Sequence, residues 1–91
     1  MNKCFLIGKV ISEPIFDFFF MKNDISICYF TITLTENNKV DVFALNDMAD
    51  FVYQNVSLDQ LIIIDGTLNS TKSGQISVMI NNIDFFDESK S

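Results

Sequence analysis

The first ten residues, MNKCFLIGKV, constrain the fold most, because they predict a β-strand that begins at the N-terminus and contains a glycine, Gly8. Glycine within a strand marks a bend or a bulge. A long first strand that bends sharply is what a small β-barrel needs in order to close on itself. The start of the sequence therefore favours a small closed barrel.

Strand patterns continue along most of the chain. Residues 25–35 alternate from Phe30 onward, with apolar side chains on one face and polar ones on the other, as in a half-buried antiparallel strand. Residues 15–21 follow Pro14 and are expected to continue the first strand after a bend. Further strands are predicted at residues 40–45, at residues 61–68 with an interruption at Asp65-Gly66, and at residues 76–86.

One helix is predicted, at Met48–Asn55, because its apolar residues fall at positions i, i+3 and i+4. Five strands with one short helix between the third and the fourth is the order of an OB-fold, an all-β barrel. An SH3-like barrel or a small sandwich could also carry this pattern, but the helix position favours the OB-fold. The 91 residues leave room for one domain, predicted over residues 1–87, with residues 88–91 fraying.

The charge of the chain limits its partners. It has six lysines, no arginine and twelve carboxylates, which give a net charge of −6. Nucleic-acid affinity comes largely from lysine and arginine at phosphates, so this balance argues against nucleic-acid binding. A lack of arginine is also what an AT-rich genome tends to produce, which weakens that argument.

No residues suggest catalysis, a metal site or a cofactor. The chain lacks histidine, a glycine-rich phosphate loop and a recognisable pair of carboxylates, so we expect no enzyme. Cys4 and Cys28 fit no metal-ligand spacing and are expected to be buried, reduced thiols. No apolar run approaches the ~20 residues of a membrane helix, and no signal peptide leads the chain. We therefore expect an intracellular protein with no membrane partner.

Five segments resemble, in the right order, the single-stranded-DNA-binding proteins of bacteria and organelles, whose domain is an OB-fold. These segments are MNKCFLIGKVISEP, YFTITL, VDVFALNDMADFV, LIIIDGTLNSTKSG and VMINNIDFFD. A short, tail-less plastid or cyanobacterial member is the nearest kind of relative. The resemblance implies non-catalytic binding of single-stranded DNA, with RNA left open, and it suggests a chloroplast or other plastid as one location.

The ligand-contacting positions of that family are only partly matched. Lys39 stands where well-studied bacterial members place a tryptophan, and Leu45 stands where they place a phenylalanine. Residues 69–73 replace a loop with a tryptophan beside basic residues, and Asp17-Phe18 replaces a basic–aromatic pair. Each lost base stack forfeits about 1–3 kcal/mol. The resemblance therefore implies weak binding that depends strongly on salt.

The candidate nucleic-acid contacts are lysines for phosphates and aromatic residues for base stacking. They are Lys9, Lys39 and Lys72 for phosphates, and Tyr29, Phe43, Phe18 and Phe19 for bases, with one of the run 18–20 expected to stack. Their alternative interpretation is solvated surface for the lysines and core for the aromatic residues. The pattern assigns Phe5, Phe30, Phe51 and Phe85 to the core.

The alternative function is a protein-interaction module that kept the barrel and lost the groove. Successive strand residues point to opposite faces, so the run from Phe16 to Phe20 cannot be buried on both sides at once. In this alternative, the exposed set of aromatic residues pairs with another subunit. A homo-oligomer is expected under both functions, because a small barrel with surplus aromatic residues has apolar surface to cover.

Overall fold

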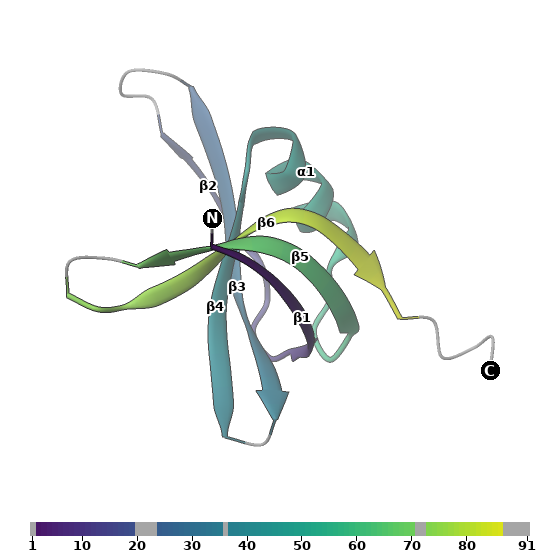
Figure 1. Ribbon diagram of the computed structural model, residues 1–91. Coiled ribbons are helices and arrows are strands. Elements are labelled where there is room, and N and C mark those ends of the chain that lie inside the picture. The colour runs from purple at the N-terminus through teal and green to yellow at the C-terminus, as the bar shows by residue number, and fades with distance from the viewer. Residues whose placement is uncertain (1, 20–23, 36, 71–72, 87–91) are drawn as a thin grey trace.

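The computed structural model describes residues 2–19, 24–35, 37–70 and 73–86 (Figure 1). Within these ranges lie six strands and one helix. In chain order they are β1 (Lys3–Val10), β2 (Ile15–Phe19), β3 (Ile25–Thr35), β4 (Asn38–Leu45), α1 (Asn46–Asn55), β5 (Leu61–Ser70) and β6 (Ile76–Phe85). The predicted fraying of residues 88–91 lies outside the described residues.

Five of the strands close into a barrel. Neighbouring strands follow the order β1, β5, β6, β4, β3, and the pairing of β3 with β1 closes the ring. The β4–β6 pair is parallel, and the other pairs are antiparallel. The helix α1 lies between β4 and β5, the third and fourth barrel strands in the sequence. The predicted all-β, five-stranded OB-fold with one short helix is therefore confirmed.

The strands β1 and β2 run in succession along one edge of β3. Val10 lies opposite Ile32 at the end of β1, and the Ile11 N–H then donates to the carbonyl oxygen of Thr31 at 2.9 Å. Ile15 lies opposite Tyr29 at the start of β2. Residues 15–19 thus continue the first strand after a bend, as predicted, and β2 extends the sheet beyond the closed ring.

Two glycines lie where strands approach closely. A Cβ added at Gly8 would be 2.8 Å from the carbonyl oxygen of Thr33 on β3. A Cβ added at Gly66 would be 2.5 Å from Val78 Cγ1 and 2.6 Å from the carbonyl oxygen of Met79, both on β6. Both positions therefore require a residue without a side chain, because the neighbouring strand occupies that space.

The predicted interruption of the fourth barrel strand at Asp65-Gly66 is wrong, since β5 runs unbroken to Ser70. The register shifts on the partner strand instead. Asp65 lies opposite Asn82 and Gly66 lies opposite Ile80, so Asn81 is an extra residue on β6. An extra residue of this kind is a β-bulge, which bends the sheet without ending the strand.

The core is formed by the inward residues of the barrel strands and one side of α1. The alternation of β3 and β4 buries Phe30, Ile32 and Val42. The other buried apolar residues are Val10, Cys28, Ala44, Ala49, Val52, Val56, Ile62, Ile64, Val78, Ile80 and Ile83. Burial raises the pKa of the Cys28 thiol to about 11, so this thiol stays protonated and unreactive at neutral pH.

Two of the four phenylalanines assigned to the core are instead exposed. Phe30 is buried and Phe85 packs against the core, but Phe5 is 68% exposed and Phe51 is 44% exposed. On β1 the inward residues Cys4 and Leu6 are apolar as well, so the sequence pattern does not distinguish the two faces. Among the described residues, no helix has the length and apolar character to cross a membrane.

Candidate nucleic-acid interface

The outer surface of β3 and β4 carries three of the residues proposed from the sequence, Tyr29, Phe43 and Lys39. Tyr29 lies opposite Phe43, and Thr33 lies opposite Lys39. Directly opposed residues on one face of an antiparallel pair have Cβ atoms about 4.5–5.5 Å apart, so their side chains adjoin. The alternation that buries the core residues of these strands turns this polar and aromatic set outward.

An apolar row crosses this surface. Ile15 lies opposite Tyr29, Tyr29 opposite Phe43, and Phe43 opposite Met79, so the row spans β2, β3, β4 and β6. Tyr29 is 41% exposed and Ile15 is 52% exposed, while Phe43 and Met79 are half-buried. We call Ile15, Tyr29, Phe43 and Met79 the apolar row. Exposed aromatic rings in such a row are the surfaces on which unpaired bases stack.

A lysine row lies four residues along the strands from Tyr29 and Phe43, beyond the pair Thr31–Asp41. Thr33 on β3 pairs with Lys39 on one side and with Lys9 of β1 on the other, so the two lysines flank the same residue. Lys39 is exposed. Lys9 forms an ion pair of 3.9 Å with Asp59, in which both side chains are more than half exposed. Exposed pairs of this kind contribute little and leave the ammonium group accessible.

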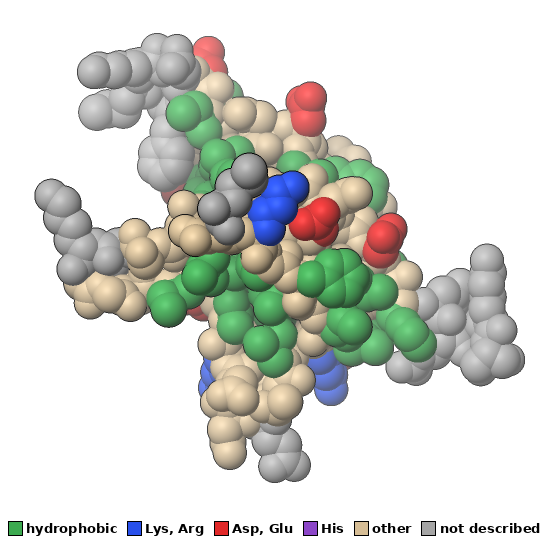
Figure 2. Space-filling view, viewed as in Figure 1, with side chains coloured by type: hydrophobic (Ala, Val, Ile, Leu, Met, Phe, Trp, Pro, Cys, Tyr) green, Lys and Arg blue, Asp and Glu red, His purple; other side chains and the backbone are tan. Residues whose placement is uncertain are grey.

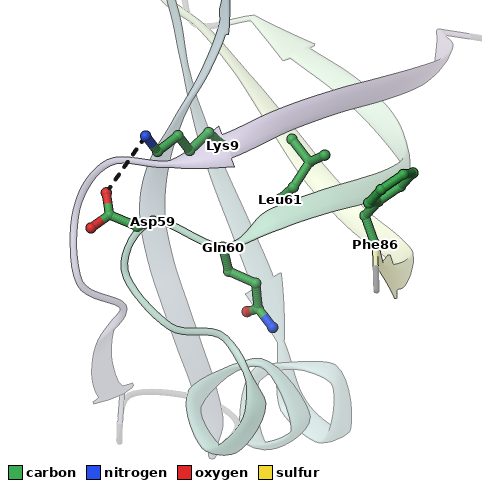
Figure 3. Close-up of a pocket in the computed structure, with 5 residues that line it drawn as sticks. All are labelled: Lys9, Asp59, Gln60, Leu61 and Phe86. Carbon is green, nitrogen blue, oxygen red and sulfur yellow. Dashed lines mark ion pairs between the residues drawn. The ribbon is translucent and has the colours of Figure 1, made fainter. Parts of the chain in front are cut away.

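Lys9 also borders a hollow of about 360 Å³ (Figure 3). Asp59 and Gln60 come from the segment between α1 and β5, and Leu61 begins β5. Phe86 follows β6 and lies at the far end of the hollow from Lys9 in this view. The hollow therefore joins the lysine row to the outer surface of β5.

A second hollow, of about 430 Å³, lies beside the apolar row and is lined by Ser12, Ile15, Tyr29, Phe30, Thr31 and Asp41. Thr31 lies opposite Asp41 on the neighbouring strand. The Thr31 hydroxyl donates to Asp41 Oδ1 at 2.9 Å, and the Thr31 N–H donates to Ser12 Oγ at 2.8 Å. These contacts hold a carboxylate at the rim of the hollow.

Most of the described carboxylates lie outside the outward positions of β3 and β4. Asp41 is the one carboxylate on the outward positions of β3 and β4 among the described residues. Asp17 is exposed on the same face of β2 as Ile15, opposite Ile27, and Asp24 precedes β3. The described aspartates outside β2, β3 and β4 lie on α1, before β5, on β5 and on β6, namely Asp47, Asp50, Asp59, Asp65 and Asp84. A net charge of −6 is therefore compatible with a β3–β4 surface that carries a lysine and few acids.

The candidate residues divide into three groups. Lys9, Lys39, Tyr29 and Phe43 are brought together on or beside the β3–β4 surface. Phe18 is 44% exposed but shares its side of β2 with Phe16, whose ring lies 5.3 Å from that of Tyr53 on α1. That side faces away from Tyr29.

Lys72 and the side chain of Phe19 lie outside the part of the chain that the structure describes. Sequence reasoning missed Ile15, Met79 and Thr31. The period-two pattern indicates that these residues face outward. Which strands pair is also needed to place them together, and the sequence alone does not provide that pairing.

Comparison with known proteins tests the architecture. No family model and no curated protein matches the sequence. Solved structures match strongly. One is the single-stranded-DNA-binding domain of a Synechococcus protein, with a TM-score of 0.82, 15% identity, and coverage of 91% of this chain and 93% of that one. The chain has an OB-fold.

Two other solved structures are similar. The single-stranded DNA binding protein from Thermus aquaticus, in a deletion mutant, gives a TM-score of 0.79 at 16% identity, over 97% of this chain and 42% of that one. The small single-stranded DNA-binding protein from Streptomyces coelicolor gives a TM-score of 0.73 at 15% identity, over 100% of this chain and 99% of that one. At such identities the likeness concerns the fold, and the binding residues rest on the geometry above.

Proposed function

We propose that this protein binds single-stranded DNA without catalysis, weakly and in a salt-dependent manner, on the outer surface of β3 and β4. The observation that carries the proposal is the outward pair Tyr29–Phe43 on adjacent strands of an OB-fold, with Lys39 four residues along β4 on the same face. The names of the three similar structures, each a single-stranded-DNA-binding protein or domain, support the same function. A plastid location stays a prediction.

The salt dependence follows from the lysine row. Each phosphate neutralised on a single strand contributes a slope of about −0.7 to the logarithm of affinity against the logarithm of salt. Two contacts, from Lys9 and Lys39, then predict a loss of roughly 25-fold between about 20 and about 200 mM salt. The absence of arginine and of tryptophan from the chain supports the weak affinity.

Fluorescence anisotropy with labelled oligo-dT at the two salt concentrations tests this proposal. We expect the wild type to bind at low salt, and Lys39→Glu to abolish binding by reversing a charge beside Thr33. Gln54→Glu is the control, because it adds negative charge at an exposed position of α1 that lines neither hollow. Equal losses in both variants, or no binding at low salt, would contradict the proposal. A matched oligo-rU strand that binds more tightly would redirect it to RNA.

We propose, in addition, that the protein forms a homo-oligomer through the outer surface of β1 and β5, which we call the β1–β5 surface. In the view of Figure 2, apolar side chains gather over these strands. Phe5 is 68% exposed, Ile7 is 53% exposed and lies opposite Ile63, and Phe86 is 52% exposed. Within the described residues, β1 pairs with β3 at Lys9 and Val10 alone, so most of that edge of β1 is open to another strand.

Light scattering coupled to size exclusion tests the oligomer. Ile7→Lys places a charge on the β1–β5 surface, and we expect it to yield monomers. Ile76→Lys is the matched control, because Ile76 is 54% exposed and begins β6. A wild-type monomer at all concentrations would contradict the oligomer. Dissociation by both variants would contradict its assignment to the β1–β5 surface, and either result would leave the DNA proposal standing.

A further inference from the structure

Asp41 is unusual for a surface that meets a polyanion. It is exposed and lies on β4 between Lys39 and Phe43, with all three pointing outward. A carboxylate at that point repels a phosphate, so the backbone of a bound strand is driven toward the lysine row. What remains beside Asp41 is the part of the nucleotide that can donate hydrogen bonds, which is the edge of the base.

The position of Asp41 fits a base edge. Residues two apart on a strand are about 6.8 Å apart, so a base stacked on the apolar row at Phe43 or Tyr29 brings its edge to the carboxylate. The hollow of about 430 Å³ beside the row is bounded by Tyr29 and Ile15 on its apolar side and by Asp41 and Ser12 on its polar side. This lining offers one apolar side and one polar side, as a base requires.

The carboxylate is also held in place. Its Oδ1 accepts from the Thr31 hydroxyl at 2.9 Å, and the Thr31 backbone is tied to Ser12 Oγ at 2.8 Å. One oxygen is therefore engaged by the neighbouring strand. Because an ionised carboxylate has about four lone-pair sites, capacity remains to accept hydrogen bonds from a ligand.

We propose that Asp41 is a specificity-determining residue that selects bases with an exocyclic amino group over thymine. This inference rests on the proposed binding of single-stranded DNA. A carboxylate accepts from the N4 amino group of cytosine, as aspartate does in other protein–DNA contacts. Thymine presents carbonyl oxygens on both sides of its one N–H, and a carboxylate repels them. Asp41 therefore favours the amino-bearing base.

Two homopolymers whose bases differ only at the hydrogen-bonding edge provide the probe. Oligo-5-methyl-deoxycytidine and oligo-dT share the methyl group and ring size, and they differ at the exocyclic amino group and N3. We expect the wild type to bind the 5-methylcytosine strand about tenfold more tightly at low salt. Asp41→Asn should reduce that ratio to about one, because its amide can donate to the thymine O4.

Removing a negative charge raises the affinity for any strand, so a charge-matched control is needed. Asp50→Asn makes the same change on α1, at an exposed position that lines neither hollow. We expect it to leave the ratio near ten. Thr31→Val, which removes the hydroxyl that orients the carboxylate, should give an intermediate ratio. Far-UV circular dichroism melts of all three variants check that the fold is retained.

The outcomes separate the two proposals. A ratio that collapses in Asp41→Asn and persists in Asp50→Asn supports base selection. Equal wild-type affinities, a preference for thymine, or an unchanged ratio in Asp41→Asn overturns base selection and leaves the proposed DNA binding intact. Absence of binding to both strands at low salt overturns both.

Discussion

The β3–β4 surface and the β1–β5 surface both expose aromatic or large aliphatic side chains, but their surroundings differ. Tyr29 and Phe43 lie on strands that are paired on both sides, with a lysine row nearby. Phe5 and Ile7 lie on a strand with an open edge, and Phe5 lies opposite Asp65. Exposed apolar area alone therefore does not identify a partner. Lysines do not separate the two surfaces, because Phe5 and Ile7 lie between Lys3 and Lys9 on the outward face of β1. The unpaired edge of β1 is the feature that favours another protein chain there.

The largest expected effect is a loss of stability where β5, from the β1–β5 surface, packs closely against β6, which carries part of the apolar row. Gly66 on β5 lies opposite Ile80 of β6, and β6 also carries Met79 of the apolar row. Gly66→Ala forces a Cβ to within 2.6 Å of the Met79 carbonyl oxygen, and we expect it to lower the free energy of unfolding by about 2–3 kcal/mol. Urea denaturation measures this loss.

Gly74→Ala provides the comparison for that measurement. Gly74 has a positive φ of 85° and no atom within 4 Å of an added Cβ, so its cost is backbone strain of about 1 kcal/mol. If the two alanine variants were equally destabilised, close approach of β5 and β6 would not be the reason for glycine at position 66.

Two phenylalanine variants test whether DNA binding and oligomer formation use separate surfaces. Phe43→Ala removes one stacking ring, and we expect oligo-dT affinity to fall by about 1–3 kcal/mol while the oligomer mass stays unchanged. Phe5→Ala should weaken the oligomer and leave the affinity per chain unchanged. Anisotropy and light scattering on the same samples report both quantities. Loss of both properties in either variant would mean that the two surfaces are coupled.

The smallest effect concerns the ion pair at the border between the surfaces. Asp59→Asn releases Lys9 from its partner at 3.9 Å, and both groups are more than half exposed. An exposed pair is worth about 0.2–1 kcal/mol, so we expect oligo-dT affinity to rise by no more than about fivefold. Asp50→Asn is the control for the change in net charge. An equal rise in both variants would mean that the pair itself has no effect on Lys9.

The sequence predicted the architecture well because its strongest signals are local. The alternation after Phe30 and the apolar spacing from Met48 correctly separated strand from helix, and their order indicated the OB-fold. The same alternation also turned Tyr29 and Phe43 outward together. It failed for Phe5, because both faces of β1 are apolar and period two then carries no information about which face is inside.

The site was harder to predict because its contacts join residues distant in sequence. Lys9 and Lys39 are neighbours through Thr33 only once the barrel closes, and the partner of Lys9 comes from the segment before β5. Met79 enters the apolar row through the parallel β4–β6 pair. Phe18 needed the position of α1, whose Tyr53 contacts Phe16 on the same side of β2.

The short pairing of β1 with β3 has a consequence for ligand linkage. Within the described residues the ring is closed there by two residue pairs, and Lys9 belongs to one of them. A strand of DNA whose phosphates meet both Lys9 and Lys39 would therefore span the seam at which the cylinder is most weakly joined. Occupancy and barrel closure would then be thermodynamically coupled, and the ligand would raise the melting temperature through that junction.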